Sequence, residues 1–496
     1  MNAQHSHTIT SLLAIAMAAT SLPALSQPGH VKHFGLGAPF QIDDLPQGHV
    51  REKLDRLPAK VRQKALNRLH SFAFTEHDLD YLQIDKHGDV LYSDTYLPDE
   101  IMADASSTSL QPEVITVTDA FTLHSKPAAG NIIYLDFNGH NISGTAWNRS
   151  TGVTTLKAKA FTTDTDISTF SSTELSQIAE IWHRVAEDYA PFNVDVTTQE
   201  PASFGPTVGR ILITQSVDSN GKKMPSSTAG GVAYVGVWGT SNYASYYSPA
   251  LIYYNNLSSG FPPYVAEAAS HEMGHNLGLS HDGYNNGTTS TGYYSGNGTG
   301  FVSWAPIMGI GYYNNVTEWS KGEYAFATQL QDDLSLISKK LTYRVDDHGN
   351  TGATPTPLFI DTSGKILATN PETDPHNSAP ENKGIIETRN DVDFFVFNAG
   401  AGTINITVTP AWDAFYRSSK RGANLDIEAT LYDANGMQIG LPNDPSIETD
   451  ATISVTVPAG LYLLAVKGVG NTSSPYSDYG SLGQYFISGT VPVPTS

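Results

Sequence analysis

Two histidines and a glutamate stand together in His271-Glu272-Met273-Gly274-His275, and a further histidine follows at His281. Residues four apart in a helix lie on one face about one turn apart, so His271 and His275 can bind one zinc ion together. Glu272 is rotated by about 100° from His271 around the helix, which places its carboxylate beside the ion as a general base toward water. Gly278 can take the left-handed conformation that ends the helix, so that His281 returns as a third ligand. Three imidazoles leave a fourth position open for water, an arrangement typical of catalytic zinc.

The composition limits the ligand types. The 496 residues include no cysteine, which excludes disulfides, thiolate metal ligands, a cysteine nucleophile and a thiol-based latency device. No glutamate occurs between His275 and Glu318, so His281 is the available third ligand. The alternatives are a surface helix with chance histidines and a purely structural metal site. The fixed spacing of Gly278 and His281 disfavours both, and the sequence predicts one catalytic Zn²⁺ with Glu272 as the catalytic residue.

The extended motif from His271 to Asp282 resembles that of the metzincin zinc peptidases, in which a methionine-containing turn lies beneath the metal. Ala305-Pro306-Ile307-Met308-Gly309 matches that turn, and the resemblance implies that Met308 forms an apolar floor under the histidines. Asn276 and Asp282 are most similar to the reprolysin (adamalysin-like) branch. That branch usually has cysteine where this chain has Pro306. The astacin and serralysin branches have a tyrosine where this chain has Ile310.

A further similarity to the reprolysin branch concerns the edge strand along which the substrate backbone pairs. The matching residues are Gly231, Val232, Ala233 and Tyr234. An exposed strand edge can hold a peptide in extended form by main-chain hydrogen bonds. The resemblance covers roughly residues 128–345 and implies a secreted endopeptidase that acts on protein or peptide substrates.

The elements that must position these residues alternate between strands and helices. Ser171 and Glu174 form a capping box for a helix that reaches Tyr189, and a second helix, with the metal motif, begins at Pro262-Pro263. Apolar runs predict strands at 132–137, 192–196, 210–214, 232–237 and 250–254. We therefore predict a metzincin-like α/β (α+β) catalytic domain over residues 126–345.

The N-terminal residues predict export and latency. The apolar run 11–20 is followed by small residues before Ser26, so residues 1–26 are predicted to be a signal peptide, with a buried helix as the alternative. Residues 27–125 are predicted to be a propeptide that inhibits the enzyme, with an ordinary N-terminal domain as the alternative. Its basic stretch Arg51–Arg68 is hypothesised to dock on the acidic remainder. Asp89, in the turn His87-Gly88-Asp89, is interpreted as part of a hairpin rather than as an aspartate switch.

Residues 346–496 contain short alternating apolar runs separated by turns, which predict an all-β sandwich. Asp391-Val392-Asp393-Phe394-Phe395 and Asn424-Leu425-Asp426 resemble segments of bacterial pre-peptidase C-terminal domains. Some related modules bind calcium, so Asp391, Asp393 and Asp426 are candidate Ca²⁺ ligands; solvated turn carboxylates are the alternative.

The formal charge of −21, from 28 basic and 49 acidic residues, disfavours nucleic acid and anionic membrane surfaces as partners. No apolar run is long enough to span a bilayer, so no membrane insertion is expected. Together these patterns predict a secreted zinc endopeptidase, found outside the cell or in the periplasm in transit. The alternative is a catalytically inactive, zinc-stabilised binding or adhesion protein.

Overall fold

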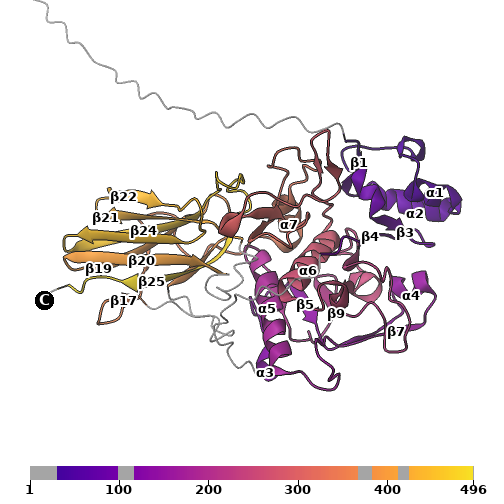
Figure 1. Cartoon of the computed structure of the whole chain (residues 1–496), viewed down its shortest axis with the longest axis horizontal. Helices are drawn as coiled ribbons and strands as arrows, with labels where there is room; N and C mark the ends of the chain where they lie inside the picture. The colour runs from indigo at the N-terminus through magenta and orange to yellow at the C-terminus, as the bar shows by residue number, and fades with distance from the viewer. Residues whose placement is uncertain (1–30, 99–116, 367–381, 412–423, 495–496) are drawn as a thin grey trace, which may run out of the picture.

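A computed structural model describes residues 31–98, 117–366, 382–411 and 424–494. The chain forms a mixed α/β part, which continues from the N-terminal segment, and a C-terminal part of β-strands (Figure 1). The predicted signal peptide lies outside the described residues. None of the helices described is both long and apolar enough to cross a membrane.

A seven-stranded sheet organises the α/β part, with the order β3-β4-β10-β11-β9-β5-β8. Strands β11, β9, β5 and β8 run parallel to one another, whereas β10 is antiparallel to both β11 and β4. The bounds are β3 Leu82–Ile84, β4 Val90–Asp94, β5 Ile132–Asp136, β8 Asp195–Thr197, β9 Val208–Thr214, β10 Gly231–Tyr234 and β11 Ala250–Tyr253. The parallel strands are almost completely buried, as expected for strands covered on both faces.

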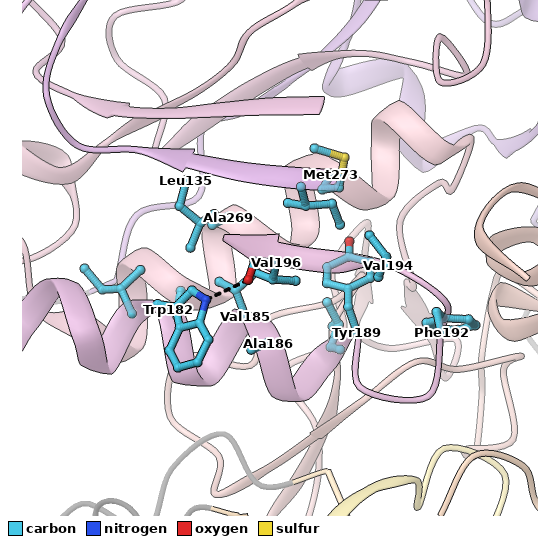
Figure 2. Close-up of a cluster of buried hydrophobic side chains, with 14 of the residues drawn as sticks. Leu135, Trp182, Val185, Ala186, Tyr189, Phe192, Val194, Val196, Ala269 and Met273 are labelled. Atoms are coloured by element: carbon cyan, nitrogen blue, oxygen red, sulfur yellow. Dashed lines mark hydrogen bonds between the residues drawn. The ribbon is translucent and has the colours of Figure 1, made fainter. Parts of the chain in front are cut away.

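Two long helices pack against this sheet and against each other. Helix α5 (Ser172–Asp188) begins with the predicted capping box, in which the Ser171 backbone N–H donates to Glu174 Oε2 over 2.8 Å. Helix α6 (Pro262–Leu277) begins with its two prolines and is buried along nearly its whole length. Figure 2 shows the packing between them and the sheet, where Trp182 of α5 donates its indole N–H to the Val196 carbonyl over 2.8 Å. The helix that bears the metal motif is thus held rigidly from several sides.

Smaller elements surround this core. Helix α4 (Ala146–Thr151) lies between the paired strands β6 (His140–Ser143) and β7 (Thr155–Ala158), and α3 (Val117–Ala120) precedes β5. The residues after α6 form short paired strands and a closing helix: β12 Tyr284–Asn285, β13 Ser290–Thr291, β14 Trp304–Pro306, β15 Val316–Glu318 and α7 Asp333–Leu341. Single turns of other helix types are η3 Tyr243–Tyr247, η4 Tyr254–Asn256 and η5 Gly300–Val302.

The N-terminal segment forms a small unit with a core of its own. The basic stretch is divided at Pro58 into two helices, α1 (His49–Arg56) and α2 (Ala59–Leu69). They pack on a cluster that Val235 of the α/β part joins. The remaining elements are β1 His33–Gly35, β2 Ala73–Thr75, η1 Ile42–Asp44 and η2 His77–Asp80. Strands β3 and β4 form the predicted hairpin and add this unit to the central sheet.

The C-terminal part consists of two five-stranded sheets with a shared buried core. One has the order β16-β19-β24-β21-β22; in the other β17-β25-β20-β23 are neighbours and β18 also pairs with β25. The bounds are β16 Thr356–Pro357, β17 Lys365–Ile366, β18 Lys383–Ile386, β19 Asp393–Ala399, β20 Gly402–Pro410, β21 Ile427–Asp433, β22 Gln438–Asn443, β23 Ala451–Val457, β24 Gly460–Gly468 and β25 Gly483–Thr490.

The C-terminal part contacts the end of α5 through buried polar groups. The Glu187 carboxylate accepts hydrogen bonds from the backbone and side-chain N–H groups of Gln484, over 3.0 and 2.8 Å. Asn424 donates to Asp188 Oδ1 over 3.1 Å. The two parts are therefore joined through buried, hydrogen-bonded side chains.

Candidate metal centre

Helix α6 and the turn that follows it bring the three predicted histidines together. His271 and His275 lie one turn apart near the helix end, and Gly278 takes a φ of 108°, the left-handed conformation that an L-residue with a Cβ rarely adopts. The chain reverses there and returns His281 to the same side. All three imidazoles are buried; the most exposed, His271, has 7% relative exposure.

Backbone carbonyls orient two of these imidazoles. His271 Nδ1 donates to the Ile307 carbonyl and His275 Nδ1 to the Leu279 carbonyl, each over 2.8 Å. With the proton on Nδ1, the Nε2 lone pair of each ring is free to bind a metal. A hydrogen bond from the other ring nitrogen usually orients a metal-bound histidine in this way. His275 Nε2 and His281 Nε2 are only 3.1 Å apart.

Two neutral imidazole nitrogens that approach so closely repel each other unless a proton or a cation lies between them. His271 Nε2 is buried and has no hydrogen-bond partner. The donor set, three buried imidazoles of which two have their Nδ1 atoms bonded to backbone carbonyls, therefore fits Zn²⁺. Burial lowers the pKa of His271 to about 3, which keeps this ring in the neutral form that a metal ligand requires.

Glu272 lies beside the histidines and against strand β10. It is 1% exposed, and its Oε2 has no hydrogen-bond partner. A Cβ atom placed on Gly231 would lie 2.2 Å from Glu272 Oε1, so the missing side chain at Gly231 creates the space for this carboxylate. Burial, together with the nearby Asp94 carboxylate, raises the pKa of Glu272 well above its usual range.

Met308 lies on the other side of the histidine group. It is fully buried, and a Cβ placed on Gly274 would approach its Sδ to 2.6 Å. The neighbouring Ile307 carbonyl accepts the His271 hydrogen bond, and the Asp282 N–H donates to the Met308 carbonyl over 2.8 Å. Met308 thus packs directly against the metal-motif helix.

The strand expected to bind substrate is covered in the full chain. Residues Gly231, Val232, Ala233 and Tyr234 form β10 as a strand, but all four are buried. The physical reason is that β4 of the N-terminal segment pairs antiparallel with β10, with Gly231 opposite Asp94 and Tyr234 opposite Leu91. The main-chain groups that a peptide would use are engaged by this chain itself.

Asp94, at the end of β4, is the main site residue that sequence reasoning missed. Its Oδ2 lies 3.4 Å from His271 Nε2 and 3.3 Å from His275 Nε2, and its Oδ1 lies 3.1 Å from His281 Nε2. Together with the three histidines it forms a buried group of four side chains that could hold one metal ion. Burial raises its pKa, but His281 and His275 outweigh burial, so the pKa of Asp94 is well below its usual range.

Other N-terminal side chains surround the centre. The ring of Tyr92 stacks on His275, with centroids 4.1 Å apart and planes at 17°. Asp78 Oδ1 lies 3.3 Å from His281 Nδ1 and accepts a 3.0 Å hydrogen bond from the Tyr92 hydroxyl. Tyr293, after α6, donates its hydroxyl to Asp94 Oδ1 over 2.6 Å. No sequence motif includes these residues. The alternation of side chains along β4, which places Tyr92 and Asp94 on one face, is the sequence pattern that could have linked these two to one site.

Asp89 lies away from the metal centre, at the start of β4. Its carboxylate accepts from the hydroxyls of Tyr246 and Tyr247, over 3.0 and 2.9 Å, and pairs with Lys64 over 2.5 Å. Within the basic stretch, Arg51 also pairs with a carboxylate of its own segment, Asp43, at 2.6 Å. Arg68 reaches the α/β part and donates to the Gly236 carbonyl over 2.9 Å.

A small pocket adjoins the metal centre. Tyr96, which continues the same face beyond Asp94, lies at this pocket and stacks on Tyr312 with an interplanar angle of 13°. The other lining residues are Asp94, Gly231, Ala268, His271, Glu272, Tyr293, Gly309 and Ile310. Tyr96, two residues beyond the metal-facing Asp94, therefore contributes to the lining of this pocket.

The candidate calcium ligands separate into two places. Asp391 and Asp393 lie with Asp346 in a group whose carboxylate oxygens are all within 4.8 Å, and Asp346 also groups with Asp347 and Glu387. Oδ1 of Asp391, Oδ1 of Asp393 and both oxygens of Glu387 are buried without a hydrogen-bond partner. Burial and the neighbouring carboxylates raise the pKa of Glu387 to about 10 and that of Asp393 to about 9.

Asp426 lies apart from that group. Its Oδ2 accepts from the Tyr476 hydroxyl over 2.7 Å and from Asn471 Nδ2 over 3.3 Å. Its Oδ1 is buried and has no hydrogen-bond partner, and Asp426 belongs to none of the possible metal-binding groups among the described residues.

Comparison with known proteins agrees with this geometry. Residues 155–282, which include α5, β10, α6 and all three histidines, match the family model described as metallo-peptidase family M12B, reprolysin-like. This segment is similar to the reprolysin-like metallopeptidases. The matched segment ends at Asp282, so it includes the metal motif and stops before Met308.

Solved structures were compared as well. The 1.0 Å crystal structure of the pre-peptidase C-terminal domain of collagenase from Bacillus anthracis shares 19% identity, over 22% of this chain and 84% of that chain, with a TM-score of 0.15. A comparison with curated proteins finds no match.

Proposed function

We propose that this protein is a secreted zinc-dependent endopeptidase, made as a zymogen, that hydrolyses peptide bonds in proteins. One observation carries the proposal: three buried imidazole Nε2 atoms converge on one point, with the Glu272 carboxylate beside them. The reprolysin-like match over residues 155–282 supports a metallopeptidase independently of this geometry.

His271, His275 and His281 would hold the zinc ion, which when bound polarises the scissile carbonyl and acidifies water. Glu272 is held in place by packing against Gly231. From there it accepts the proton of the attacking water and later donates it to the leaving amine. Strand β10, once free, pairs with the substrate backbone and holds it extended across the histidines.

The zymogen part of the proposal rests on the N-terminal segment. Its strand β4 occupies the edge that a substrate needs. We propose that residues 27–125 act as the enzyme's own inhibitor and are removed after export, which the signal peptide over residues 1–26 would direct. A protein that stayed uncleaved would present neither β10 nor the histidines to a peptide.

The test compares casein hydrolysis by the processed protein, the processed protein with 1,10-phenanthroline, and a Glu272→Gln variant. Removal of the general base is expected to lower kcat by roughly 10²- to 10⁴-fold at unchanged zinc content. Glu200→Gln, whose side chain is 61% exposed, is the matched control and should retain full activity. Equal activity in wild type and Glu272→Gln would rule out the mechanism.

The rival function is a catalytically inactive binding or adhesion protein stabilised by zinc. Glu272 argues against it, because a buried unpaired carboxylate is costly and binding zinc does not need it. Absence of any hydrolysis by zinc-loaded, processed protein would favour this rival.

We also propose a Ca²⁺ site at Asp346, Asp391 and Asp393, supported by the buried Oδ1 atoms of Asp391 and Asp393, which have no hydrogen-bond partner. Carboxylate oxygens are the ligands that Ca²⁺ prefers, and such a group repels itself without a cation. Millimolar CaCl₂ should raise the melting temperature of chelator-treated protein at pH 8, and Asp393→Asn should reduce that rise. Asp433→Asn, in an exposed turn, is the control. An unchanged melting temperature in wild type would refute the site.

A further inference from the structure

The face of β4 that meets the metal centre is built from alternate residues. Tyr92, Asp94 and Tyr96 follow one another at the two-residue spacing that places side chains on one face of an extended chain. Tyr92 stacks on His275, Asp94 faces all three Nε2 atoms, and Tyr96 stacks on Tyr312 at the adjoining pocket. Three successive side chains of one face therefore contact three neighbouring parts of the site.

The backbone of the same strand fills the substrate's place. Four residues of β4 pair in register with four residues of β10, from Asp94 opposite Gly231 to Leu91 opposite Tyr234. Because each main-chain group on this edge can pair with one partner strand only, a peptide cannot bind while β4 remains. The contact has the form of a bound peptide rather than of a separate lid.

The Asp94 carboxylate is held at a defined position. The Tyr293 hydroxyl donates to its Oδ1 over 2.6 Å, and its backbone is fixed opposite Gly231. Each carboxylate oxygen lies 3.1–3.4 Å from at least one imidazole nitrogen. Three imidazoles and one carboxylate complete the four-ligand set of a closed zinc site, in which no position remains for water.

We propose that Asp94 is the fourth ligand of the zinc ion in the latent protein, so that this carboxylate replaces the catalytic water while β4 excludes the substrate. The proposal rests on the proposed function only in that the three histidines bind zinc. In this chain without cysteine, a carboxylate thus occupies the fourth metal position and keeps the site inactive. Removal of the N-terminal segment opens the metal position and the strand edge in one step.

The folded N-terminal unit holds the Asp94 carboxylate close to the metal position. It has its own apolar core, which extends to Val235 at the end of β10, and Asp89 and Arg68 anchor it to the α/β part. A ligand tethered in this way competes at an effective concentration of millimolar or more, although a single carboxylate binds zinc weakly. A free ligand must overcome that concentration to reach the metal.

The experiment uses the full chain loaded with Co²⁺ in place of zinc, and its readout is the visible absorption spectrum during titration with acetohydroxamate. Wild type should respond only at high ligand concentration, whereas Asp94→Ala should bind acetohydroxamate at least about tenfold more tightly and have an altered spectrum before ligand is added. Asp80→Ala removes an exposed carboxylate of the same segment and should behave as wild type.

Asp94→Asn serves if the alanine variant does not fold, since asparagine keeps the volume and the Tyr293 contact but is a poor zinc ligand. Equal spectra and dissociation constants, within a factor of two, in wild type and either folded Asp94 variant would overturn the proposal. If the Asp94 variant has an open metal position but processed protein does not hydrolyse casein, the Asp94 proposal stands and the peptidase function is refuted. If processed protein hydrolyses casein but the Asp94 variants bind acetohydroxamate as wild type does, only the Asp94 proposal is refuted.

Discussion

Gly231 is expected to be essential because its missing side chain is the space that Glu272 occupies. In Gly231→Ala the new Cβ would lie 2.2 Å from Glu272 Oε1, 2.5 Å from its Cγ and 2.7 Å from its Cδ, where ordinary contact begins at 3.4 Å. The carboxylate must therefore retreat by about 1 Å, and a displacement of that size in a catalytic group can lower the rate by about 100-fold. Forcing a methyl group into this packed site should also cost about 1 to 3 kcal/mol of folding free energy.

The assay measures kcat and KM on a peptide substrate with processed protein, together with zinc content and the melting temperature. The histidines do not contact position 231, so zinc content should stay at one per chain while kcat falls. Gly230→Ala is the matched control, because its Cβ would meet the ends of two flexible side chains, Leu257 at 3.0 Å and Leu97 at 3.5 Å. A Gly231→Ala protein that binds zinc normally and keeps kcat within about threefold of wild type, well short of the loss expected from displacement, would refute the reasoning.

Three further predictions concern stability. Met308→Ala should lower the free energy of unfolding by about 2 to 5 kcal/mol, measured by urea denaturation, whereas Met308→Leu should cost less than about 1.5 kcal/mol, because only alanine leaves a cavity beneath α6; equal costs would contradict this packing role. Burial raises the pKa of Glu187 from 4.5 to about 7, so the folded protein binds the extra proton and stability should fall as pH rises from 4.5 through 7. Glu187→Gln should reduce the dependence of the melting temperature on pH over this range. An unchanged dependence on pH would contradict the raised pKa of Glu187. Chelation with 1,10-phenanthroline should lower the melting temperature of wild type, since zinc at a thousand times its dissociation constant adds about 4 kcal/mol; a His275→Ala variant should not respond.

Local patterns predicted the elements around the site well. The capping box of Ser171 and Glu174 and the prolines at 262–263 locate both helix starts, because helix ends depend on nearby side chains. The left-handed turn at Gly278 follows for the same reason. Asp94 differs, since nothing in its neighbourhood distinguishes it from Asp89 or Asp78. Its role depends on the pairing of β4 with a strand about 140 residues later in the chain, which local sequence does not encode.

The sequence by itself determined the chemistry of this protein: the ligand types, the helix that spaces His271 and His275, and the absence of any thiol. Only the tertiary structure decided how these side chains are oriented and whether a substrate can reach them. Hydrogen bonds from Nδ1 to the Ile307 and Leu279 carbonyls aim the imidazoles, and β4 covers the edge predicted to be open. The physical reason is the separation along the chain over which each interaction acts. Helix periodicity acts over a few residues, whereas strand pairing and burial join segments that only folding brings together.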